Sequence, residues 1–154
     1  MKFKMIMLCM AVLFVYAIQA LGDGLSDIDA KKIVKSYLNN KEPKGEGDQV
    51  TNQLNKWILN DIDGDGEKDV IIQYTLLGPT WWKNYLAAIL IKKGKPQKPI
   101  ETEISGEVAL NNIDNGVIII SGKKYAKGDP ICCPSIGYVA KYKLKDKKII
   151  EVNK

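Results

Sequence analysis

The sequence contains no histidine and no arginine, so all 23 of its basic residues are lysines. Without histidine, the chain has no Ser-His-Asp or Cys-His catalytic group and no histidine-ligated zinc site. Without arginine, it lacks the side chain that most often reads nucleic-acid bases through paired hydrogen bonds. Its lysines are also scattered among 18 acidic residues. These absences exclude much enzyme chemistry and argue against nucleic acid as a partner.

Long apolar runs are equally scarce. The main one is the uncharged stretch from Met5 to Ile18, which follows Lys2 and Lys4 and ends just before Ala20. A basic start, a short apolar run and a small residue are typical of a cleaved secretory signal. A membrane anchor is the alternative, but a bilayer span needs ~20 apolar residues. We expect residues 1–20 to be a cleaved signal peptide and residues 21–154 to form a single globular domain, secreted or periplasmic, without a stable membrane span.

The rest of the chain shows one helical pattern followed by strand patterns. Ser26 and Asp29 resemble a capping box, and apolar residues recur at helical spacing as far as Leu38. Asn115-Gly116 is a typical hairpin turn between two strands. The strand-like runs that follow the helix are 54–59, 70–76, 85–91, 100–104, 108–113, 117–120, 138–144 and 149–152. The expected fold is α+β, with one N-terminal amphipathic helix and a twisted antiparallel sheet of about seven strands.

Acidic residues gather in the stretch Asp61-Ile-Asp63-Gly-Asp65-Gly-Glu67-Lys-Asp69. Calcium takes about 6–8 oxygen ligands, and glycines allow the tight backbone that wraps one ion. We expect calcium to be bound by four aspartate side chains and the Glu67 carbonyl. A standard EF-hand is excluded because its twelfth position, a glutamate, is Ile72 here. The pattern resembles the Asp-x-Asp-x-Asp-Gly-x-x-Asp calcium loops of integrin-type (FG-GAP) repeats, which lie between two strands. An empty Asp-Gly turn is the alternative.

Two adjacent cysteines, Cys132 and Cys133, are the only ones left once the signal is removed. In an exported protein they form a vicinal disulfide, stay as two buried thiols, or act as a redox or metal-binding pair. Neighbouring Cα atoms lie ~3.8 Å apart, closer than the ~4.4–6.8 Å of relaxed disulfides. The favoured interpretation is a strained vicinal disulfide.

Aromatic residues cluster at Trp81, Trp82 and Tyr85, in and beside a predicted loop between two strands. Exposed tryptophans on a loop are typical anchors for proteins or glycans, so these three residues are predicted to bind a partner. The alternative is that they fold back and complete the core. A strand over 70–76 would hold this loop ~20 Å from the acidic loop. The two features therefore cannot form one active site.

From Trp57 to Val152 the chain resembles a group of small exported bacterial proteins, most of which have no assigned activity. The resemblance rests on the Asp-Gly loop, the Val-Ile-Ile-Gln-Tyr-Thr and Tyr-Leu-Ala-Ala strands, and the Asp-Pro-Ile-Cys-Cys-Pro-Ser segment at 129–135. It implies an exported domain. The sequence therefore predicts an exported, calcium-stabilised binding protein whose partner is another exported protein or an envelope component, with an inhibitor or immunity-type role as the most concrete version. The alternative is a thiol-dependent redox protein that uses the adjacent cysteines.

Overall fold

A computed structural model describes residues 24–41, 50–130 and 133–152. Over these ranges the protein is mostly β, with one helix, α2 (Asp27–Asn39), ahead of the strands. The first antiparallel sheet has the order β1-β2-β3-β6 and is built from β1 (Thr51–Asn60), β2 (Asp69–Leu77), β3 (Trp82–Ile89) and β6 (Ile100–Ile104). The second has the order β10-β9-β8-β7 and is built from β7 (Glu107–Asp114), β8 (Val117–Lys124), β9 (Ile136–Lys145) and β10 (Lys148–Glu151). A small ribbon pairs β4 (Ile91–Lys92) with β5 (Lys95–Pro96).

The prediction of one sheet of about seven strands is therefore wrong, and the reason lies at Gly106. This residue follows β6 with a φ of 88°, and a Cβ there would lie 2.8 Å from the carbonyl oxygen of Lys123. Glycine meets both constraints because it has no side chain. The chain turns this corner out of the first sheet and into the second, as strands do in packed-sheet folds.

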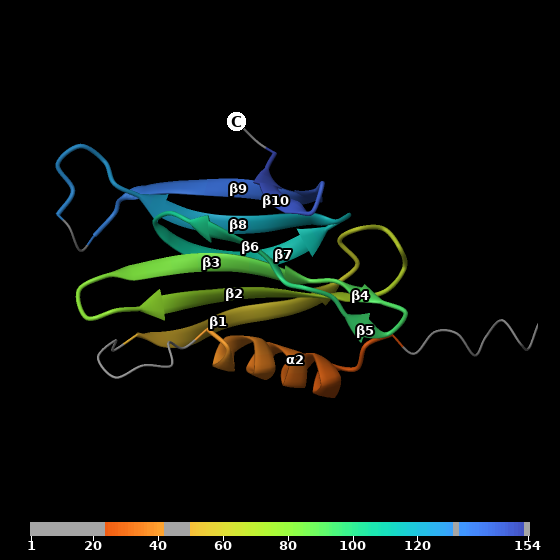
Figure 1. Cartoon of the computed structure of the whole chain (residues 1–154). Helices are drawn as coiled ribbons and strands as arrows, with labels where there is room; N and C mark the ends of the chain where they lie inside the picture. Colours follow the sequence, from red (N-terminus) through yellow and green to blue (C-terminus); the bar gives the residue numbers. More distant parts are fainter. Residues whose placement is uncertain (1–23, 42–49, 131–132, 153–154) are drawn as a thin grey trace, which may run out of the picture.

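The two sheets and the helix make three layers (Figure 1). Between the sheets lies one hydrophobic core, which includes Ile71, Leu86, Leu110, Ile118 and Ile120. A second core lies between the first sheet and α2, and it includes Val34, Leu38, Val70, Ile72 and Tyr74. Strand β2 contributes to both cores, so seven of its nine residues are buried.

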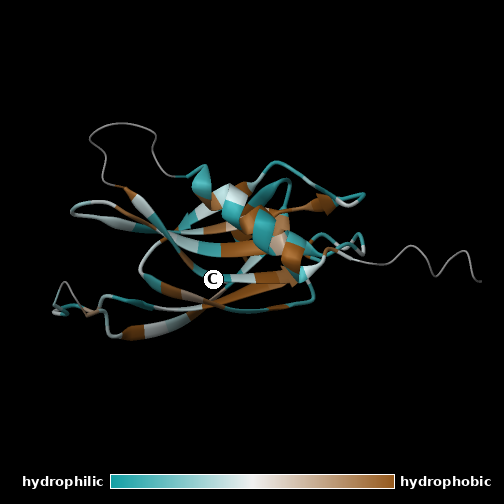
Figure 2. Ribbon diagram, turned by 90° about the horizontal axis from the view of Figure 1, so that it is seen from below, coloured by the Kyte–Doolittle hydropathy of each residue, from teal (hydrophilic) through white to brown (hydrophobic). Residues whose placement is uncertain are grey.

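The predicted helix is confirmed. Ser26 is its N-cap: the Ser26 Oγ accepts a hydrogen bond from the Asp29 backbone N–H at 3.2 Å, as the capping pattern predicted. Four residues, Ala30, Val34, Tyr37 and Leu38, are buried against the first sheet. Figure 2 shows the helix lying over this sheet with hydrophilic and hydrophobic residues alternating along it. None of the helices among the described residues is long and apolar enough to cross a membrane.

Candidate functional site

The acidic loop joins β1 to β2, between two strands as predicted. Three of its carboxylates come together: oxygen atoms of Asp61, Asp63 and Asp65 all lie within 4.8 Å of one another. Such a group could hold a metal ion, because hard cations take carboxylate oxygens as ligands.

The loop is wrapped by its own backbone. One oxygen of Asp61 accepts a hydrogen bond from the Gly64 N–H at 2.7 Å, and the other accepts one from the Gly66 N–H at 2.8 Å. Both glycines lie in the left-handed region, with φ values of 81° and 89°. Their role in the tight backbone is confirmed, since few other residues adopt this conformation without strain.

Lys92, on β4, supplies a positive charge that the sequence argument did not include. Its ammonium group contacts a carboxylate oxygen of Asp63 and lies 2.5 Å from one of Asp65. Hydrogen bonds hold the pKa of Asp65 below its ordinary value; the bond from Lys92 has the largest effect and the bond from the Glu67 N–H the next largest. The same carboxylates raise the pKa of Lys92. Lys92, which lies 27 residues after Asp65 in the sequence, therefore offsets part of the repulsion between the carboxylates of the loop.

The carboxylates of Glu67 and Asp69 lie outside this group of three, whereas the ligand predicted from Glu67 is its backbone carbonyl. Glu67 turns its side chain to the β4–β5 turn, where its two oxygens accept hydrogen bonds from Lys93 N–H at 2.9 Å and Gly94 N–H at 3.1 Å. Asp69 is fully buried and accepts hydrogen bonds from Ile62 N–H at 3.1 Å and Ile91 N–H at 2.9 Å. Burial raises the pKa of Asp69, although both backbone bonds act to lower it. These two carboxylates dock the β4–β5 ribbon onto the loop.

The tryptophans lie at the opposite end of β2, as predicted, because Leu77 pairs with Trp82 while Val70 pairs with Ile89. Trp81 is 41% exposed and Trp82 is 50% exposed, so neither completes the core. The Trp81 indole packs on Gly78, where an added Cβ would lie 2.3 Å from the ring.

Tyr85 does not share a face with Trp82. Side chains alternate along a strand, and Tyr85 packs with the core beneath α2. Its ring stacks on Tyr74 with 5.2 Å between the ring centroids. Trp82 is on the other face of β3, toward the second sheet. The predicted trio of partner-binding aromatics is thus divided between two layers.

The cysteine segment follows a loop organised by Asp129. This carboxylate accepts hydrogen bonds from Ala126 N–H at 2.7 Å and from Ser135 N–H at 2.8 Å. These hydrogen bonds lower the pKa of Asp129, and the bond from the Ala126 N–H has the largest effect. Cys133 is disulfide-bonded. Cys132 lies outside the described residues, so a bond between these two neighbours stays a prediction.

A polar cluster between α2 and β6 was missed by sequence reasoning. Glu101 accepts hydrogen bonds from the Tyr37 hydroxyl at 2.5 Å and the Lys41 ammonium at 2.6 Å, and Tyr74 also donates to it at 3.2 Å. Burial acts to raise the pKa of Glu101, but the bonds from Lys41 and the tyrosines outweigh it and leave the pKa lowered. No local pattern links Glu101 to its three partners, which lie 27 to 64 positions before it in the sequence. The cluster fastens the helix to the sheet.

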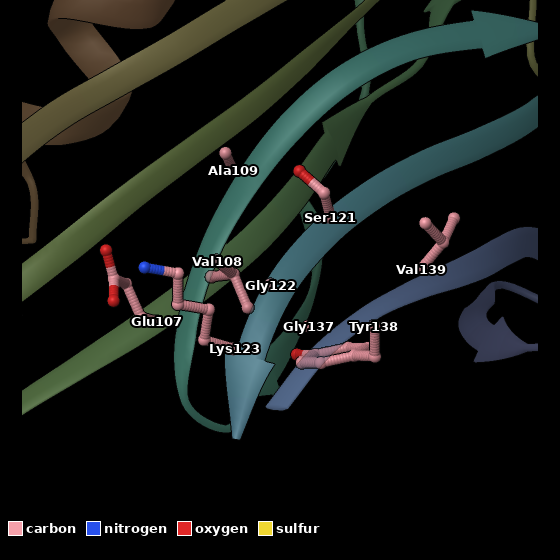
Figure 3. A pocket seen from close by; sticks show the side chains of 9 residues that line it. All are labelled: Glu107, Val108, Ala109, Ser121, Gly122, Lys123, Gly137, Tyr138 and Val139. Carbon is pink, nitrogen blue, oxygen red and sulfur yellow. The ribbon is translucent and has the colours of Figure 1, made fainter. Parts of the chain in front are cut away.

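The outer face of the second sheet carries a shallow hollow of about 620 Å³. Figure 3 shows Ala109, Ser121 and Val139 on the neighbouring strands β7, β8 and β9, where they form one row across the sheet. The Ser121 hydroxyl donates to the amide oxygen of Asn111 at 2.9 Å and not to a base. The hollow therefore offers no activated serine.

Comparison of the chain with protein-family models, with curated proteins and with solved structures finds no match.

Proposed function

We propose that this chain is an exported binding protein stabilised by calcium at the loop formed by residues 61–69. The observation that carries the proposal is the convergence of Asp61, Asp63 and Asp65 on a loop already wrapped by backbone hydrogen bonds. Three negative charges this close call for a positive charge among them. Calcium suits the site because it accepts many oxygen ligands in flexible geometry, whereas magnesium demands near-octahedral geometry and keeps its waters.

Lys92 is the residue that calcium would have to displace. Its side chain is 38% exposed and long, so it can move into solvent. Exposed ion pairs contribute little to stability, so their loss is readily outweighed by a divalent ion. In this proposal the ammonium group holds the loop together when calcium is absent.

The opposite end of the sheets would meet the partner. Trp81, on the short loop between β2 and β3, and Trp82, at the start of β3, are large, exposed side chains of the kind that act as aromatic anchors. The partner we propose is an envelope component or another exported protein, and calcium would act by stabilising the domain that presents this end. Export rests on the N-terminal pattern, and an intact mass reduced by about twenty residues in the exported protein would support it.

Thermal unfolding in calcium and in chelator tests the metal site. A ligand that binds only the folded state adds ~2.7 kcal/mol at one hundred times its Kd. The unfolding midpoint should therefore rise by about 5 °C or more in saturating calcium, and by less in magnesium. Asp63→Ala and Asp65→Ala should abolish the rise. Glu103→Gln, which changes an exposed carboxylate on β6, should keep it. Equal midpoints for the wild type in chelator and in millimolar calcium would show that the loop is only a turn.

A further inference from the structure

A cleft of about 350 Å³ opens between the two sheets at the end opposite the acidic loop. Leu77 and Trp82 contribute to it from the first sheet, and Tyr125 and Pro134 from the loop that joins β8 to β9. Trp82 and Tyr125 are each about half exposed. The structure thus brings the tryptophan loop and the segment after the cysteines, two unusual stretches of the sequence, to one small site.

Beneath these aromatic walls lies a polar base. Thr75 and Asn84 are more than nine-tenths buried, and both line the cleft. The Thr75 hydroxyl oxygen lies 2.6 Å from the amide oxygen of Asn84 and 3.0 Å from that of Asn55. A hydroxyl has one proton and can serve only one of these acceptors. An amide oxygen at the base of the cleft therefore retains capacity for a donor from a ligand.

The base and one wall are held in place by other contacts. The Asn84 amide nitrogen donates to the Gly106 carbonyl at 2.8 Å, at the corner where the chain changes sheets. Asp129 ties Ala126 to Ser135, and so fixes the two ends of the loop that carries Tyr125 and Pro134. A site whose groups are already positioned binds without the cost of ordering them.

We infer that this cleft binds a carbohydrate, a mono- or disaccharide unit of a neutral glycan. A sugar ring has an apolar C–H face that packs on aromatic rings and hydroxyl groups that bond to amides and hydroxyls. The cleft offers both surfaces, and among the described residues that line it only Glu107 is charged. Its volume is at the lower end of the range for small-molecule sites. The inference rests on the proposed binding function and gives the envelope partner a chemical class.

Isothermal titration of the exported protein with chitotriose and with maltotriose tests the inference. At least one of the two should bind, and Trp82→Ala and Tyr125→Ala should each weaken binding about tenfold or more, since aromatic anchors dominate such sites. Val139→Ala is the control, because this apolar side chain is 62% exposed on β9 and does not line the cleft. Val139→Ala should change the affinity by less than about twofold. Asn55→Ala should weaken binding of the sugar and leave binding of an apolar dye unchanged.

Three results would overturn the inference: no binding of either sugar at millimolar concentration, equal losses in Val139→Ala and Trp82→Ala, or capture of an envelope protein that depends on Trp82 while neither sugar binds. Each titration is run in calcium and in chelator. Sugar binding that persists while calcium fails to raise the unfolding midpoint would reject only the calcium site. A normal calcium shift without sugar binding would reject only the carbohydrate assignment.

Discussion

Gln73 joins the two sheets, and its replacement gives a sharp test of the fold. The residue is 2% exposed on β2. Its amide nitrogen donates to the Val108 carbonyl and its amide oxygen accepts from the Leu110 N–H, both at 2.7 Å. The two backbone groups belong to β7, directly before the irregularity in its pairing with β8. One side chain of the first sheet thus positions the edge strand of the second.

Gln73→Leu keeps the volume of the side chain and removes both hydrogen bonds. Each buried backbone group left without a partner costs ~1–3 kcal/mol, or ~2–6 kcal/mol for the pair. Burying an apolar leucine in place of an amide returns ~1–2 kcal/mol of this. The midpoints of these two ranges predict that the free energy of unfolding falls by about 2.5 kcal/mol and that the unfolding midpoint falls by at least about 5 °C.

Urea denaturation of wild type and variant, followed by circular dichroism, measures this loss. Gln53→Leu, at an exposed position on β1, is the matched control and should stay within ~0.5 kcal/mol of the wild type. If Gln73→Leu is as stable as the wild type, apolar packing alone sets the spacing of the sheets, and the argument from buried hydrogen bonds fails.

Three further predictions concern the loop and the helix. Lys92→Met should tighten calcium binding in isothermal titration, because the competing ammonium group is gone; weaker binding would show that Lys92 supports the ion-bound loop. Asp69 has a raised pKa in the folded state, so it binds protons more readily there than in the unfolded chain. The stability of the wild type relative to Asp69→Asn should therefore increase as the pH is lowered from neutral toward the ordinary aspartate range, and a difference independent of pH in chemical denaturation would contradict this. Ser26→Ala removes the acceptor of the Asp29 N–H and should cost about 1 kcal/mol of unfolding free energy in urea denaturation, whereas an unchanged value would mean that the cap contributes nothing.

Features that depend on neighbouring residues could be predicted from the sequence. The helix begins where Ser26 can accept a bond from Asp29, three residues away. The β7–β8 turn lies at Asn115-Gly116, where both residues have positive φ. The acidic loop wraps through bonds that span three to five residues. In each case the cause is local, since turn chemistry and capping act over a few residues.

Features that depend on distant pairing were decided by the tertiary structure alone. The alternation in β2 puts the polar residues Gln73 and Thr75 on the face opposite Tyr74. A second sheet covers that face, so both side chains are buried and bonded within the protein. Pairing between distant parts of the chain also brings Lys92 to the acidic loop and places Trp82 in one cleft with Tyr125. A strand's period shows which residues share a face, but what covers that face depends on contacts far apart in the sequence.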